Sequence, residues 1–198
     1  MTGWGLPPLS LPHRVSDRPR SVGQLDFPHE TEVHRKELQA AHDAVPGVYE
    51  EVRREVRDAF GRELAPALVP YRIEDAEHVL VSMGTTASTV RAVVDEARAE
   101  GIRVGAVRIR MFRPFPEEAL RGLLARATRV GVIDRDLCPG QGGIVWSEVR
   151  PAAAPGAIVQ GYMAGLGGGD VRPVHVRGML DDLRSRARAE APRFVEVG

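Results

Sequence analysis

The sequence is poor in several residue types, and each shortage excludes a class of protein. It contains one cysteine, Cys138, among 198 residues, so it can form no intrachain disulfide and cannot by itself ligate an iron–sulfur cluster through cysteines. Aromatic residues make up only 5% of the chain. No apolar run approaches the roughly 20 residues that a membrane-spanning helix requires. We therefore expect a soluble protein of a reducing, cytoplasmic compartment.

The chain also lacks net charge, because 27 basic residues balance 27 acidic ones. A neutral chain has no global field that would attract nucleic acid or an anionic membrane, so we expect neither as a partner. Lysine is nearly missing: Lys36 is the only one, and all other basic residues are arginine. In a chain this rich in Ala, Gly and Pro, that bias is typical of a GC-rich genome rather than of a selective demand for guanidinium groups.

The middle of the chain alternates short apolar runs with segments that are apolar on one side only. Three runs, at residues 78–83, 102–109 and 130–134, predict strands. Between them, apolar residues recur at helical spacing, namely Val90, Val93, Val94 and Ala97, and then Leu120, Leu123, Leu124 and Ala127. A fourth strand is expected at residues 157–163 and a last helix from Pro173. This order predicts an α/β fold in three layers, α/β/α, with a mostly parallel sheet.

Four regions are expected, which are an extended arm at 1–28, a helical linker at 29–70, the α/β domain at 71–190 and a tail at 191–198. The arm holds five prolines and no periodic apolar pattern, so it should form no core of its own. Within the linker, Pro46 and Gly47 should kink or split the helix. The end of the linker, residues 65–71, is expected to be an irregular connector that contains proline.

Thr85 and Thr86 follow the first predicted strand and begin the first helix of the α/β domain. As N-cap residues, their hydroxyls would accept hydrogen bonds from free backbone amides, and we favour this structural role. The amides of such a turn can also hold a phosphate, which is the functional alternative for Thr85–Ser88. Neither G-x-G-x-x-G nor G-x-x-x-x-G-K-[ST] is present there, so the turn does not indicate a nucleotide.

Two glycine-rich loops follow the third and fourth predicted strands. The glycines of interest are Gly140, Gly142 and Gly143 in the first loop, and Gly165, Gly167 and Gly168 in the second. The first loop precedes a short helix, so its amides could form a nest for an anion, and its glycines would also permit close approach of another subunit. We weigh these two roles equally for the first loop, with a plain flexible loop as a third alternative. For the second loop we favour contact with another chain.

Charged residues complete the candidates. Arg110 and Arg113 lie in the turn before Pro116, where guanidinium groups could bind a carboxylate or phosphate, although pairing with neighbouring acids is favoured. Asp134 ends a predicted strand, where ligand sites of α/β proteins gather, yet nothing in the sequence converges on it. We expect it to face solvent or to pair with arginine. The histidines show no metal-type spacing and there is no G-x-S-x-G motif, so we predict no catalytic, cofactor-binding or metal-binding residue.

Several stretches together resemble the alpha subunit of pyruvate:ferredoxin oxidoreductase and of related 2-oxoacid:ferredoxin oxidoreductases. They are residues 71–77, 79–84, 108–116, 132–135, 142–143, 148–150 and 164–168. The most specific is the turn Arg-Met-Phe-Arg-Pro-Phe-Pro at residues 110–116. The resemblance covers roughly residues 6–185 and is to the C-terminal half of that subunit. It implies a transketolase C-terminal-like domain.

The resemblance also implies a function. The family carries out oxidative decarboxylation of a 2-oxoacid with coenzyme A, and electrons pass through thiamine diphosphate and iron–sulfur clusters to ferredoxin. The G-D-G…N-N pattern that holds thiamine diphosphate and its Mg²⁺ is missing here, so we expect these cofactors and the clusters on partner chains. We therefore expect a non-catalytic structural or interface part, inactive alone, whose partners are other subunits of the complex or a second copy in a homodimer. The alternatives are a stand-alone module that binds a small anionic or phosphate-bearing ligand, or a truncated gene product.

Overall fold

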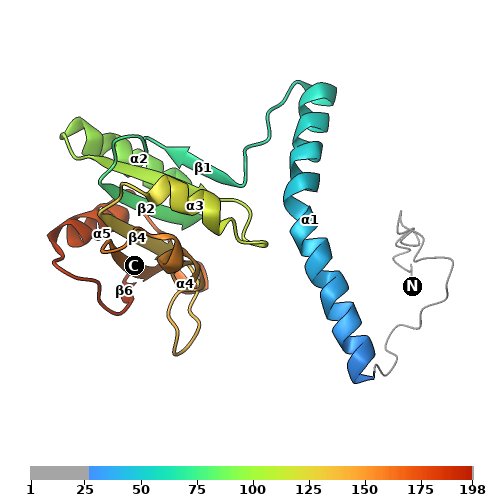
Figure 1. The fold of residues 1–198 in the computed structure, drawn as a ribbon. Helices are drawn as coiled ribbons and strands as arrows, with labels where there is room; N and C mark the ends of the chain where they lie inside the picture. Colours follow the sequence, from blue (N-terminus) through green and yellow to red (C-terminus); the bar gives the residue numbers. More distant parts are fainter. Residues whose placement is uncertain (1–26, 198) are drawn as a thin grey trace, which may run out of the picture. The chain divides into compact units, whose positions relative to one another are not determined.

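The structure, a computed structural model, describes residues 27–197 (Figure 1). Nearly all of the predicted arm lies outside these residues. The chain divides into two units, the first ending at His42 and the second beginning at Asp43, and each is considered by itself. The second unit contains the whole predicted α/β domain.

A six-stranded sheet forms the centre of the second unit, in the order β1-β3-β2-β4-β5-β6. Its strands are β1 (Leu68–Tyr71), β2 (His78–Met83), β3 (Val104–Ile109), β4 (Arg129–Asp134), β5 (Ile158–Ala164) and β6 (Arg193–Val195). Only β1 runs antiparallel to its neighbour, β3, and every other adjacent pair is parallel. The predicted mostly parallel sheet is confirmed.

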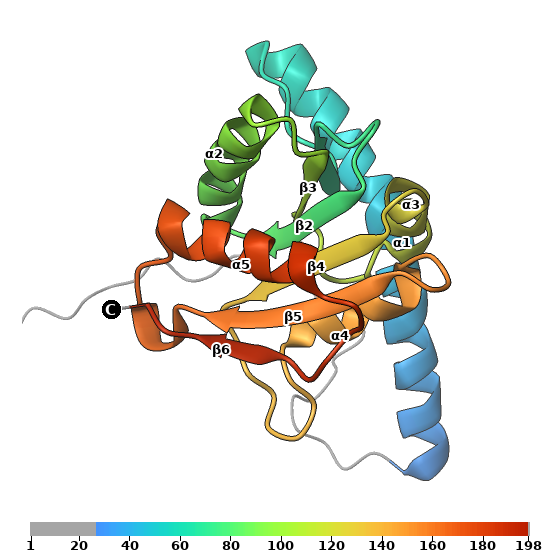
Figure 2. The same cartoon turned by 90° about the vertical axis from the view of Figure 1, so that its left-hand side faces the viewer.

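Helices cover both faces of the sheet (Figure 2). On one face lie α2 (Thr86–Ala99) and α5 (Pro173–Ser185), and on the other α3 (Glu117–Leu124), α4 (Ile144–Val149) and the short 3₁₀ helix η1 (Arg150–Ala152). The faces alternate along each strand, so that Leu80 packs beneath α2 whereas Val79 and Val81 join the core of α3 and α4. The three-layer prediction is thereby confirmed.

The linker differs from the prediction, because one helix, α1 (Pro28–Phe60), runs through Pro46 without a break. Proline removes one backbone donor from a helix interior. No residue of α1 is buried, so water can replace the lost hydrogen bond and the helix continues. Within the second unit, the end of α1 is tied to the connector that follows: the hydroxyl of Tyr49 donates to the carbonyl of Ala65 at 2.9 Å, and Arg53 Nε donates to that of Leu64 at 2.7 Å.

The sequence prediction missed both edge strands. The expected connector contains β1, which tolerates Pro70 because an edge strand leaves one side of its backbone unpaired. The expected tail contains β6 and is held by the buried side chain of Gln160. Its Oε1 accepts the amide of Glu190 at 3.1 Å, and its Nε2 donates to the carbonyl of Ala191 at 3.1 Å. The tail is thus part of the folded domain.

Candidate functional site at the carboxyl edge of the sheet

The parallel topology brings all ten candidate residues to one edge of the sheet. Thr85 and Thr86 follow β2, Arg110 and Arg113 follow β3, Gly140, Gly142 and Gly143 follow β4, and Gly165, Gly167 and Gly168 follow β5. The chain leaves β2 towards β3 on one side and leaves β4 towards β5 on the other. The gap between the ends of β2 and β4 is therefore the switch point at which open α/β sheets bind ligands.

The turn after β2 does not carry the predicted hydroxyl cap. Thr85 is the N-cap residue of α2, but its side chain makes no capping hydrogen bond. Its backbone is already helical, at φ −72° and ψ −28°, whereas a capping residue is typically extended. Thr86 is the first helical residue, and its buried hydroxyl has no partner among the residues that the structure describes. Thr85 thus holds the predicted N-cap position, but the predicted capping hydrogen bond from a hydroxyl is not formed by either threonine.

Asp134 occupies the position that we had considered for an external anion. It is 2% exposed, and its two carboxylate oxygens accept the amides of Val145 at 3.0 Å and Trp146 at 2.9 Å in the first turn of α4. Burial raises the pKa of the Asp134 carboxyl, the two amide hydrogen bonds oppose that shift, and the charge of Asp136 adds to it. The expectation that Asp134 faces solvent or pairs with arginine is therefore wrong. It serves as the cap of α4 from the neighbouring strand.

The first glycine loop is shaped around this carboxylate. A Cβ at Gly143 would collide with the carboxylate of Asp134, so glycine is required there for an intrachain reason. Gly142 has φ +97°, and a Cβ there would lie 2.8 Å from Cγ of Pro192. Gly140 has φ +83° and open space around it. A contact between this loop and another chain stays a prediction.

The arginine turn is partly engaged within the chain. Arg113 Nη2 donates to the carboxylate of Glu148 on α4 at 2.5 Å, and its guanidinium carbon lies 4.1 Å from the ring centre of Phe112. Pairing with an acid was the favoured interpretation and is confirmed for Arg113. Arg110 is exposed and forms no ion pair with any residue in the described part of the chain. Glu148 lies 35 residues from Arg113, so no local pattern could identify it.

The second glycine loop is held by an arginine that sequence reasoning missed. Arg135 Nη2, at the end of β4, donates to the carbonyls of Gly165 at 3.2 Å and Gly169 at 3.0 Å. Gly165 has φ +71°, and a Cβ there would lie 2.7 Å from the carbonyl oxygen of Gly169. Gly167 and Gly168 have open space instead, and Leu166, at the start of η2 (Leu166–Gly168), is 40% exposed. The inner side of the loop is therefore closed and its outer side is accessible.

Residues 27–197 contain no group of three or more His, Cys, Asp or Glu side chains that could hold a metal ion. No helix in that range is long and apolar enough to cross a membrane.

Comparison with known proteins places this geometry in a family context. The family model described as pyruvate:ferredoxin oxidoreductase core domain II matches residues 76–176. Pyruvate synthase subunit PorA of Thermotoga maritima is 38% identical over 184 residues, which are 91% of this chain and 47% of that protein. Ketoisovalerate oxidoreductase subunit VorA of Pyrococcus horikoshii is 33% identical over 184 residues, 90% of this chain and 47% of that protein. The chain thus spans about half the length of the curated relatives it matches.

A solved structure shares the fold. The 2-oxoglutarate:ferredoxin oxidoreductase from Magnetococcus marinus, determined with 2-oxoglutarate, coenzyme A and succinyl-CoA bound, aligns with a TM-score of 0.55. The alignment covers 80% of this chain and 24% of that chain at 17% identity. At this identity the likeness shows the fold alone.

Proposed function

This chain belongs to the pyruvate:ferredoxin oxidoreductase core domain II family, and we propose that it is the non-catalytic, subunit-contacting part of a 2-oxoacid:ferredoxin oxidoreductase alpha subunit. In this proposal, partner chains hold thiamine diphosphate, its Mg²⁺ and the iron–sulfur clusters. The start of α4 does not fit a diphosphate, because the amides of Val145 and Trp146 already donate to the Asp134 carboxylate.

The observation that carries the proposal is that most of the polar side chains named at the carboxyl edge are bound to partners within the chain. Asp134 caps α4, Arg113 pairs with Glu148, and Arg135 holds the second glycine loop. The groups that face outward include the exposed Leu166, glycine backbone with open space around it, and the exposed Arg110. Glycine backbone and an exposed apolar side chain suit close approach of another chain better than they suit acid–base or nucleophilic chemistry.

Purification of the tagged full chain from its host tests this function. We expect it to recover subunits that carry the thiamine site and ferredoxin-like clusters, identified by mass spectrometry of the bound proteins. Recovery of the chain alone, or only as a homodimer, would contradict the proposal. Loss of binding to a coenzyme A-like phosphate ligand, with assembly unchanged, in variants of the glycine loops would favour the binding-module alternative.

A pair of variants locates the contact. Leu166→Asp places a charge on the outward side of the second glycine loop and should reduce subunit recovery at least about tenfold, because burying an unpaired carboxylate is costly. Ala99→Asp places the same charge at the exposed end of α2, which lies at the opposite edge of the sheet, and should leave recovery unchanged. Equal recovery of subunits by both variants would show that the carboxyl edge is not part of the interface. Circular dichroism checks that both variants are folded.

A further inference from the structure

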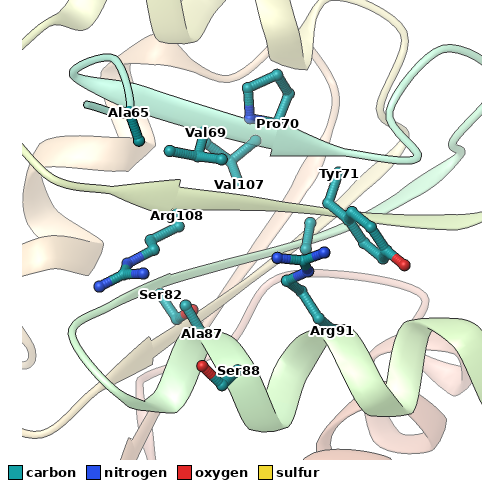
Figure 3. A pocket seen from close by; sticks show the side chains of 11 residues that line it. Ala65, Val69, Pro70, Tyr71, Ser82, Ala87, Ser88, Arg91, Val107 and Arg108 are labelled. Carbon is teal, nitrogen blue, oxygen red and sulfur yellow. The ribbon is translucent and has the colours of Figure 1, made fainter. Parts of the chain in front are cut away.

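A cavity of about 270 Å³ lies between α2 and the strands β1, β3 and β2 (Figure 3). All of its lining residues belong to the second unit. Of the turn 85–88, which the sequence offers as an alternative phosphate site, Ala87 and Ser88 line the cavity, whereas Thr85 and Thr86 do not. Its polar lining consists of Tyr71, Ser82, Ser88, Arg91 and Arg108, and its apolar lining includes Val69 and Ala87.

The sheet register explains why the cavity exists. Val69 pairs with Arg108 and Arg108 with Ser82, so these three residues form one row across three adjacent strands. Further along α2, large side chains such as Val90 fill the space above the sheet. At the first turn, small Ala87 and Ser88 stand over this row. The space between α2 and the sheet is therefore incompletely filled above the polar residues Arg108 and Ser82.

The charge in the cavity is of one sign. Arg108 comes from β3 and Arg91 from α2, and both guanidinium groups border the space that contains Ser82 in Figure 3. No acidic residue lines the cavity, and neither arginine forms an ion pair with a residue of the described chain. Arg91 is stacked over Tyr71, with its guanidinium carbon 4.3 Å from the ring centre. By contrast, Arg98 on the same helix is bound to the carboxylate of Asp75.

Ser82 gives an independent indication of a ligand. Ser82 is one of the lining residues and is 1% exposed, and its buried hydroxyl has no hydrogen-bond partner within the described residues. A buried hydroxyl without a partner is unfavourable. An oxygen-bearing ligand in the cavity would satisfy it. The first turn of α2, whose dipole favours negative charge, stands over the same space.

We propose that this cavity binds a small organic anion whose carboxylate or phosphate lies between Arg91 and Arg108, within reach of the Ser82 hydroxyl, and whose apolar body packs on Val69. Guanidinium groups suit both anions because their donors match the spacing of the oxygens. The volume of about 270 Å³ exceeds the cavity of about 150 Å³ that holds benzene in an engineered protein. A phenyl-sized body with one anionic group therefore fits. The site does not depend on the proposed subunit role.

Calorimetric titration of the full chain tests the site with phenyl phosphate, benzoate, inorganic phosphate and phenol as probes. We expect saturable one-to-one binding of phenyl phosphate or benzoate, weaker binding of inorganic phosphate and none of phenol. The stronger of the two aromatic anions identifies the anionic group. Failure of both aromatic anions to bind would overturn the proposal.

Arginine variants assign the site. Arg108→Gln should weaken binding of the aromatic anion about tenfold, equivalent to about 1.4 kcal/mol. Arg126→Gln removes the same charge from an exposed position outside the cavity and should have no effect. An equal loss of affinity in both variants, or unchanged affinity in both, would overturn the assignment of the site. Arg91→Gln provides a second variant from a different element if Arg108→Gln does not fold.

Ser82→Ala separates a ligand site from a packing defect, because the free and bound chains should respond in opposite directions. Removal of an unpartnered buried hydroxyl should raise the thermal midpoint of the free chain. The same change should weaken binding of the aromatic anion about threefold or more, because its hydrogen bond to the ligand is lost. Unchanged affinity would overturn the role of Ser82 in the site.

Discussion

Asp134 shows how a single side chain can decide the use of a whole edge of the sheet. Its carboxylate accepts hydrogen bonds from two of the free amides at the start of α4, and Gly143 makes room for it. A helix N-terminus that looks available in the sequence is thereby filled from within the chain. Arg113 and Arg135 are also bound within the chain, each by a partner that is distant in sequence: Glu148 for Arg113, and the carbonyl of Gly169 for Arg135.

The cap predicts a specific loss of stability. Asp134→Asn retains the size of the side chain but replaces one acceptor oxygen with an amide group, which meets a backbone N–H as another donor. We expect the free energy of unfolding to fall by about 1–3 kcal/mol, measured by urea denaturation. Asp136→Asn, at an exposed position two residues on, is the matched control and should change it little. Equal effects would show that the cap does not stabilise the fold.

His78, at the start of β2, predicts a pH dependence. Burial lowers the pKa of its imidazole below the ordinary 6.5, and the nearby charges of Arg129, Arg184 and Arg103 lower it further, against the opposing charge of Glu77. The unfolded chain then binds the proton more readily, so stability rises with pH across this window. The contribution of neutral His78 is complete above about pH 6.5 and is lost as the pH falls towards the depressed folded pKa.

Urea denaturation between pH 7.5 and 5.5, a range of roughly one unit around the ordinary histidine pKa, measures this effect. The wild-type chain should lose stability over the range more steeply than His78→Gln, which has no titratable group there. Parallel slopes for the two proteins would show that His78 titrates with the same pKa in both states.

At the scale of elements, the edge strands depend on side chains from the interior. The segment after α5 reaches the sheet because Gln160 binds Glu190 and Ala191. Asp182 on α5 adds a second attachment, since its carboxylate accepts hydrogen bonds from the Tyr162 hydroxyl at 2.7 Å and from Arg186 at 2.7 Å and also pairs with Arg193. β6 is three residues long, so these bonds add to its short ladder with β5 in holding it in place.

Substitution of Gln160 tests this attachment. Gln160→Leu removes both hydrogen bonds, so the Glu190 amide and the Ala191 carbonyl lose their protein partner, and β6 should detach while the rest of the sheet persists. Trypsin should then cleave after Arg188 at least about tenfold faster, as expected for a local opening that has become more favourable by more than 1.4 kcal/mol. Gln160→Glu keeps the acceptor for the Glu190 amide and should fall between the two. Unchanged cleavage would show that Asp182 alone holds the segment.

At the scale of the whole molecule, the two edges of the sheet differ in kind. Arginine–carboxylate pairs such as Arg98–Asp75 and Arg177–Glu100, at 2.7 Å and 2.6 Å, fasten segments at the amino edge. The carboxyl edge has one such pair, Arg113–Glu148, and in addition carries glycine loops, the second of which has an accessible outer side. This asymmetry suits a domain that is fixed at one edge and contacts other chains at the other.

The proposed role predicts that the isolated chain has no 2-oxoacid oxidoreductase activity. Purified protein should show no turnover with pyruvate, coenzyme A, thiamine diphosphate, Mg²⁺ and a low-potential electron acceptor, because the proposal places the thiamine site and the iron–sulfur clusters on partner chains. Addition of the subunits recovered with it should restore turnover in the same assay. Turnover by the chain alone would refute the non-catalytic assignment.

The sequence by itself determined the layers and the family. Apolar periodicity is a local property, so the four interior strands and the helices α2 to α5 could be predicted from residues a few positions apart. The turn at residues 110–116, with its surrounding motifs, was specific enough to indicate the family that the comparisons show.

Only the tertiary structure decided what each polar residue does. Strands β1 and β6 are short and owe their existence to a neighbouring strand or to Gln160, neither of which leaves a local pattern. Asp134 meets α4 eleven residues later, and Arg113 meets Glu148 across 35 residues. The cavity arises because β1, β3 and β2 align Val69, Arg108 and Ser82 in one row. Such contacts depend on which distant segments become neighbours, and this is decided only when the chain folds.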